Sequence, residues 1–329
     1  MDNKSETAEH GLICAFDLDG KGGGRELSWL EINEPQQADV VRWIHLDHTA
    51  RDSRSWLTTQ SGLNEPIIDA MLETETRPRC LQTGAGILLV MRGVNLNPEA
   101  EFEDMVSIRD WLDSDQIITT RHRKLQSIQK IRGELLDGSG PKDQAEFLEL
   151  MTRYLGDNIA GIIESLDESL DQLELATEAN RAPGLHGELG DLRRKTAYLR
   201  RFLTPQREAL DRLSRSQSEL LSPDAVAEIH QEANRMVLFV EELDLARERA
   251  MVIREEMISN LAQDQNSKMF LLSLIAAVFL PLSFITGMMG MNTAGMPGSE
   301  NSMGFWIVTA LMLLTGIGIL LVFRWKRWM

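Results

Sequence analysis

The chain has 329 residues, a mass of 37.1 kDa, a formal net charge of -16 and a mean hydropathy of -0.20. So acidic a balance excludes a nucleic-acid-binding role, which needs a basic face, and the two cysteines, Cys14 and Cys80, cannot build a disulfide framework. The sequence offers no nucleophile–base pair, phosphate loop or metal-ligand cluster at convincing spacing. We therefore predict that the protein is not an enzyme and has no cofactor.

Residues 1–141 are predicted to form a mixed α/β cytoplasmic domain. Four short runs rich in β-branched and aromatic residues predict strands, at 12–16, 41–46, 87–91 and 116–120. His45, Asp47 and His48 have side chains that could bind Zn2+. Alternation along a strand places His48 on the face opposite the other two, which disfavours a shared site.

Residues 142–222 are predicted to form a charged helical pair. The first helix is acidic and the second basic, with a break at 182–184, which suggests an antiparallel arrangement. The acidic face is either a solvated surface or an attractor of cations. The acidic residues are Glu164, Asp167, Glu168, Asp171, Glu174 and Glu178, and the basic ones are Arg193, Arg194, Arg200 and Arg201.

Residues 223–268 are predicted to form a stalk helix that continues into the membrane. From Asp224 to Leu280 the chain contains no Gly and no Pro. As one helix, this stretch is about 85 Å long. A single small domain cannot bury both ends of such a helix, so it needs partner helices.

Residues 269–329 are predicted to form a transmembrane domain. Two uncharged stretches, about 269–289 and 305–323, are each long enough to span a bilayer, and 290–304 is the external loop. Lys268 precedes the first span, and Arg324, Lys326 and Arg327 follow the second. The positive-inside rule therefore places both termini in the cytoplasm. The three terminal cations are also suited to anchoring lipid headgroups.

One stripe along the stalk and first span is unusually small and polar. Steps of four and three residues give Glu255, Ser259, Ala262, Asn266, Met269, Ser273, Ala276, Leu280, Ser283 and Gly287. Small residues at this spacing can allow membrane helices to pack closely. Alternatively, the stripe lines a water-filled pore with Met269 and Leu280 as apolar rings. A closed pore needs several copies of the chain, which predicts a ring with cyclic symmetry.

The segment 281–292 resembles the signature of the CorA superfamily of divalent-cation transporters, because Gly290, Met291 and Asn292 match its Gly-Met-Asn motif. The segments that most resemble the ZntB zinc-transporter branch are 76–79, 120–124, 138–141, 200–207 and 294–298. Met289 and Gly298 depart from the magnesium-type pattern, which has Tyr and an acid at those places.

This resemblance implies a funnel-shaped homopentamer in the bacterial inner membrane, an α+β cytoplasmic domain with a mixed sheet, and a pore lined by the first membrane helix. It also implies that Arg324, Lys326 and Arg327 form a basic collar near the stalk. The transported ion would be Zn2+, with Mg2+, Co2+, Ni2+ and Cd2+ as further candidates, and transport in this branch is associated with a proton gradient.

The stripe and loop contain no His or Cys, which Zn2+ prefers as ligands. We hypothesise that Asn292, repeated around the ring, holds a hydrated ion by outer-shell hydrogen bonds, and that Glu255 attracts the ion on the cytoplasmic side. Neither span holds a carboxylate or His for a proton relay. Two alternatives stay open: a CorA-type magnesium/cobalt channel, and a membrane-anchored metal sensor or scaffold.

Overall fold

The computed structural model describes residues 10–74, 76–98, 100, 104–179, 184–291 and 303–326. The chain forms two compact units, Met1–Arg254 and Glu255–Met329. The first unit holds a sheet and the helices that cover it, and the second holds the two apolar helical segments.

A seven-stranded mixed sheet organises the first unit, in the order β2-β1-β3-β7-β6-β5-β4. Strands β3 and β7 are parallel, and the other neighbouring pairs are antiparallel. The strands are β1 (Leu12–Leu18), β2 (Gly24–Glu26), β3 (Arg42–Asp47), β4 (Arg79–Thr83), β5 (Gly86–Gly93), β6 (Val106–Leu112) and β7 (Gln116–Arg121).

The four predicted strands are confirmed as β1, β3, β5 and β7. The sequence did not predict β2, β4 and β6. In β6 the adjacent charges Arg109 and Asp110 break the apolar pattern, yet both side chains are buried, on opposite faces of the strand. Burial of a charged residue in a central strand is unusual, which is why the pattern did not indicate a strand.

Two short helices, α2 (Arg51–Thr59) and α3 (Glu65–Leu72), cover one face of the sheet. Trp56 and Met71 from these helices pack with Ile44, Leu88 and Trp111 of the strands in one buried cluster. Helix α3 begins after Asn64, whose side chain accepts a hydrogen bond from the backbone N–H of Ile67.

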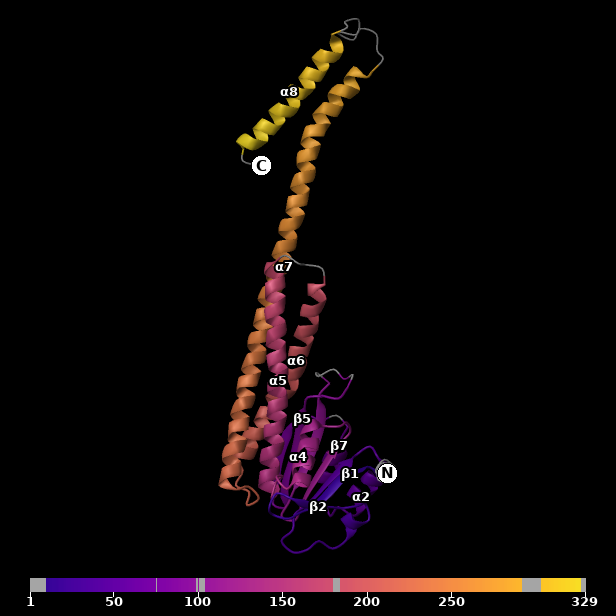
Figure 1. Cartoon of the computed structure of the whole chain (residues 1–329), viewed down its shortest axis with the longest axis vertical. Coiled ribbons are helices and arrows are strands. Elements are labelled where there is room, and N and C mark those ends of the chain that lie inside the picture. The colour runs from indigo at the N-terminus through magenta and orange to yellow at the C-terminus, as the bar shows by residue number, and fades with distance from the viewer. Residues whose placement is uncertain are drawn as a thin grey trace. The chain divides into compact units, whose positions relative to one another are not determined.

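Longer helices lie on the opposite face (Figure 1): α4 (Gln126–Asp137), α5 (Gln144–Glu178) and α6 (Leu185–Ser214). Phe147 of α5 packs on Trp43 of β3 with ring centroids 5.2 Å apart. Helix α4 ends at Gly138, whose φ of 75° is a left-handed conformation that favours glycine. The side chain of Asp143 then caps α5 by accepting from the N–H of Glu146.

Helix α7 (Pro223–Met289) confirms the prediction of one long helix, and it continues through Pro281. In the first unit its apolar side packs beside α5 and α6. Most of the buried apolar positions recur every three or four residues: Ala225, Ile229, Ala233, Met236, Phe239, Val240, Leu243, Ala246, Ala250 and Ile253. This spacing is typical of a helical-bundle seam. Past Met257, the described residues of α7 include no fully buried side chain.

Ion pairs correct one detail of the predicted helical pair. Helices α5 and α6 do pack together, but the acidic face of α5 pairs with α7 rather than with the arginines of α6. Arg249 of α7 binds Asp167, Asp171 and Glu174. Arg200 of α6 instead pairs with Asp244 of α7 at 2.7 Å. Helices α5 and α6 are adjacent in the sequence and carry opposite charges, yet residues of both form ion pairs with α7.

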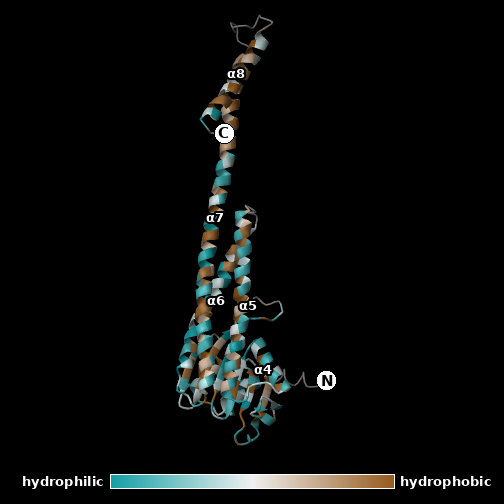
Figure 2. Ribbon diagram, turned by 60° about the vertical axis from the view of Figure 1, so that its left-hand side comes forward, coloured by the Kyte–Doolittle hydropathy of each residue, from teal (hydrophilic) through white to brown (hydrophobic). Residues whose placement is uncertain are grey.

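The second unit consists of the last part of α7 and α8 (Gly304–Trp325). Both helices are long and apolar enough to cross a membrane, and no residue of their most apolar windows is buried. Figure 2 shows these segments in brown. Outside a membrane, an exposed apolar surface of this extent would drive association.

Candidate ion path

The stripe of ten small or polar positions lies along the outer surface of α7 in a single chain. Every one of its residues, from Glu255 to Gly287, is exposed. The two large apolar members, Met269 and Leu280, are 68% and 69% exposed. Burial against the described residues of the chain therefore does not account for the segregation of small and polar residues on this side.

The partly buried residues of the same helix lie on a different side. They include Leu274, Val278, Pro281 and Ile285, which recur at helical spacing. Helix α8 runs back beside this end of α7 (Figure 1) and has its own partly buried series. Successive residues of a helix are about 100° apart, so this series and the stripe lie on nearly opposite sides of α7.

Two local features mark the end of the stripe. Pro281 lacks an N–H, so the carbonyl of Ala277 loses its usual helical donor beside the predicted apolar ring at Leu280. The Thr286 hydroxyl, off the stripe, donates back to the carbonyls of Leu282 and Ser283 at 3.1 and 3.0 Å. Its polarity is thereby satisfied within the helix, as is common for hydroxyl side chains in membrane helices.

The predicted motif is only partly described by the structure. Gly290 and Met291 follow the end of α7, and the N–H of Gly290 donates to the carbonyl of Thr286 at 2.9 Å. Asn292 lies outside the described residues. Of the predicted collar, Arg324 lies in the last turn of α8, Lys326 follows it, and Arg327 lies outside the described residues.

The histidines of the first unit do not form a shared metal site. His45 is buried, with its Nδ1 2.6 Å from Thr119 Oγ1, and burial lowers its pKa well below the usual value. Asp47 accepts hydrogen bonds from Thr49 instead. Among the described residues, no three His, Cys, Asp or Glu side chains are grouped to hold a metal. His122, His186 and His230 are exposed.

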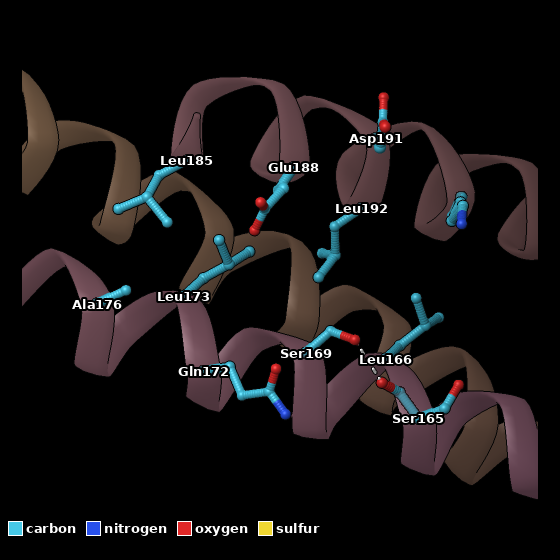
Figure 3. A pocket seen from close by; sticks show the side chains of 11 residues that line it. Ser165, Leu166, Ser169, Gln172, Leu173, Ala176, Leu185, Glu188, Asp191 and Leu192 are labelled. Carbon is cyan, nitrogen blue, oxygen red and sulfur yellow. Dashed lines mark hydrogen bonds between the residues drawn. The ribbon is translucent and has the colours of Figure 1, made fainter. Parts of the chain in front are cut away.

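A hollow of about 540 Å3 lies between α5 and α6, and its two acidic lining residues, Glu188 and Asp191, come from α6. In Figure 3, Glu188 points toward Leu173 across this hollow, whereas Asp191 points away. Asp191 pairs with Arg194, and the leucines 166, 173, 185 and 192 supply much of the lining. One carboxylate among leucines and serines is a poor site for a divalent cation, which takes several oxygen ligands.

Comparison with known proteins covers nearly the whole chain. Residues 38–327 match the family described as "CorA-like Mg2+ transporter protein". The chain is 38% identical over 330 residues to the divalent cation transporter CmaX of Pseudomonas aeruginosa, with 98% of both chains covered. It is 30% identical over 317 residues to the zinc transport protein ZntB of Yersinia enterocolitica, with 96% of each covered.

Solved structures agree with this assignment. The structure of full-length CmaX matches with a TM-score of 0.85 at 36% identity, over 97% of this chain and 99% of that one. The CorA magnesium transporter from Methanocaldococcus jannaschii matches with a TM-score of 0.80 at 17% identity, over 94% and 96% of the two chains. The second match shows that the fold is shared.

Proposed function

This chain belongs to the CorA-like family of divalent-cation transporters, and we propose that it moves Zn2+ across the bacterial inner membrane. The ion passes, largely hydrated, through a central pore formed by α7 from five copies of the chain, with both termini in the cytoplasm. The family is one of transporters, not of enzymes.

The observation that carries the pore is the exposed stripe from Glu255 to Gly287. None of its residues is buried by the described part of the chain, and the face of α7 nearest α8 is a different one. A ring of copies would bring the stripes together around an axis and leave the leucine- and phenylalanine-rich sides for lipid and neighbouring helices. Close packing of α7 against a neighbouring copy would also use small residues, but it does not need Glu255 and Asn266.

The path is chemically suited to a hydrated ion. Its side chains offer the hydroxyls of Ser273 and Ser283 and the amide of Asn266, and the motif adds the amide of Asn292. These groups hydrogen-bond to water held by an ion more readily than they replace that water. Copies of Asn292 around the axis would hold such an ion at the outer end of the pore. Copies of Glu255 would raise the local cation concentration at the inner end.

The choice of zinc rests on the relatives named zinc transport proteins and on Met289 and Gly298, which depart from the magnesium-type pattern. Mg2+ is the second candidate, because the motif Gly290-Met291-Asn292 is the general CorA form and the matching family is described by Mg2+. Outer-shell recognition discriminates weakly between these ions, so the two candidates make different predictions only in flux measurements.

The test is flux into liposomes that contain the purified chain and a zinc-sensitive dye, with and without an inward proton gradient. Asn292→Ala is the test variant, and Asn301→Ala in the same loop is the matched control. Zinc entry that Asn292→Ala abolishes and Asn301→Ala preserves supports the proposal, and acceleration by protons adds coupling. Equal flux of Mg2+ without pH dependence indicates the channel. Absence of metal flux under every condition overturns transport and leaves the sensor or scaffold.

A further inference from the structure

A basic hollow of about 690 Å3 lies in the first unit, where β6, α2 and α6 contribute its lining. Six arginines line it: Arg54, Arg77, Arg92, Arg109, Arg123 and Arg201. Two histidines, His48 and His122, join them, and Asp104 is the one acidic residue among the described lining residues. This concentration of positive charge contrasts with the net charge of -16 of the whole chain.

The deepest cation of the hollow has unused hydrogen-bonding capacity. Arg109 is 1% exposed, and its Nη2 donates to the carbonyl of Glu73. Its Nε and Nη1 have no hydrogen-bond partner among the described residues. Burial, with Arg92 nearby, lowers the pKa of Arg109 to about 10, so it remains charged at neutral pH. Buried donors without an acceptor are costly, and a native site that retains them calls for a ligand or water.

His48, beside Arg109, is a second buried side chain with unused hydrogen-bonding capacity. It is 3% exposed, its Nδ1 has no partner among the described residues, and its pKa is lowered to about 4 by burial and then by Arg109. A neutral imidazole can donate one hydrogen bond to an anion. Two buried donors therefore lie at the bottom of the same hollow, whereas Arg54, Arg77, Arg123 and Arg201 are exposed around it.

The walls are held independently of any ligand. Arg92 donates to the carbonyls of Thr76 and Met105, and its guanidinium lies 4.2 Å from the ring centroid of Phe202. Tyr198 packs edge-on against Phe202 with ring centroids 5.2 Å apart. These contacts fix the positions of the segments that carry Arg77 and Arg201. Preorganised cations of this kind lose less entropy when they bind an anion.

The hollow also unites sequence segments that the ion path leaves without a role. Arg77, Arg123 and Arg201 come from three of the segments that marked the branch resemblance, 76–79, 120–124 and 200–207, and all lie far from the membrane spans in sequence. Arginine presents a planar fork that matches phosphate oxygens in two parallel hydrogen bonds. The volume and the spread of four exposed arginines around two buried donors exceed what a single phosphate requires.

We propose that this hollow is a binding site for a small molecule with two or more phosphate groups, with Arg109 and His48 contacting the innermost phosphate and Arg77, Arg123 and Arg201 the outer one. Arg123 pairs with Asp104, and it would release that carboxylate when it contacts the outer phosphate. Two sources share this chemistry: an inorganic pyrophosphate-type anion, and a nucleoside diphosphate whose base would lie near Tyr198.

The test is isothermal titration of the full-length chain in detergent with pyrophosphate and, separately, with ADP, in EDTA so that the anion is not delivered as a metal complex. Binding of either probe with a Kd below about 1 mM is expected, as is a tenfold or greater increase of Kd in Arg77→Gln. Arg109→Gln should have at least that effect. Arg194→Gln, an exposed arginine on the same helix as Arg201 but outside the hollow, is the matched control and should bind normally.

The probes distinguish the sources. Equal affinity for the two indicates recognition of the phosphates alone, and tighter binding of ADP adds a base contact. Failure of both probes to bind the wild type overturns the proposal. So does an equal loss in Arg77→Gln and Arg194→Gln, because that would show general charge attraction. If Arg109→Gln does not fold, the exposed Arg77→Gln still decides the question. None of these results depends on metal flux.

Discussion

Arg249 Nη2 of α7 lies 2.5 Å from Asp171 Oδ1 of α5. The same guanidinium contacts Asp167 and Glu174 at 2.7 Å, and the hydrogen bonds that Arg249 donates to Asp171 and Glu174 are the main cause of its raised pKa. One cation therefore joins three carboxylates of the acidic helix to the long helix. The acidic face therefore helps to hold α5 against α7, in addition to any attraction of cations.

Arg249→Gln is expected to lower the stability of the first unit by about 1 kcal/mol, because the network is partly exposed and each pair is screened. The loss should shrink as salt rises. Thermal unfolding of the full-length chain in detergent, at low and high salt, measures this. Arg254→Gln, which replaces an exposed arginine five residues further along α7, is the control. A loss that does not change with salt would contradict an electrostatic role.

Gly156→Ala in α5 tests the packing of α5 on α7. A Cβ at this position would overlap Oε2 of Glu232, which is 7% exposed and held by Arg235 at 3.2 Å. Displacing Glu232 should cost about 1–3 kcal/mol, which exceeds the gain of about 0.5–1 kcal/mol from replacing a helical glycine. Chemical or thermal unfolding gives the difference.

Gly161→Ala in the same helix is the matched control, because a Cβ there meets nothing within 4 Å. That variant should be stabilised by about 0.5–1 kcal/mol. Stabilisation of both variants would show that the contact between Gly156 and Glu232 is loose.

Asp110→Asn tests a buried carboxyl on β6. Burial raises its pKa well above 3.8, and Arg109 only partly opposes this. In the unfolded chain the Asp110 carboxyl loses its proton near the ordinary pKa, whereas in the folded chain it keeps the proton to higher pH. The wild type therefore loses stability as pH rises above about 4 until the folded pKa is passed.

Asparagine has no proton to lose, so Asp110→Asn should gain stability relative to the wild type as pH rises from about 4 toward 7. Melting temperatures of both proteins across this range measure the difference. A constant difference would show that the carboxyl titrates alike in the folded and unfolded chains.

Glu255→Gln tests the proposed inner end of the pore. If copies of Glu255 surround the axis, loss of their charge should lower the initial rate of metal entry about threefold or more at low ionic strength. Liposome flux at low metal concentration measures this rate. Glu256→Gln removes the same charge one residue away and off the stripe, so its rate should stay near that of the wild type. Equal effects of the two substitutions would place Glu255 outside the path.

The binding site proposed for phosphates shows where sequence patterns reach their limit. Arg77 comes from the segment before β4, Arg109 from β6 and Arg201 from α6. No spacing along the chain relates them. One signal was available: a charged pair, Arg109 and Asp110, lies inside the largely apolar segment 106–112, and buried charges are costly unless they have partners.

The sequence by itself determined the long helix, the two apolar segments and the stripe from Glu255 to Gly287. These depend on neighbours three or four residues apart and on transfer of contiguous segments out of water, both of which are local properties. Only the tertiary structure decided the placement of β4 and β6 on either side of β5, the partner of the acidic helix, and the convergence of arginines in one hollow. Those contacts join residues distant in the chain, and their energies depend on burial that no local pattern specifies.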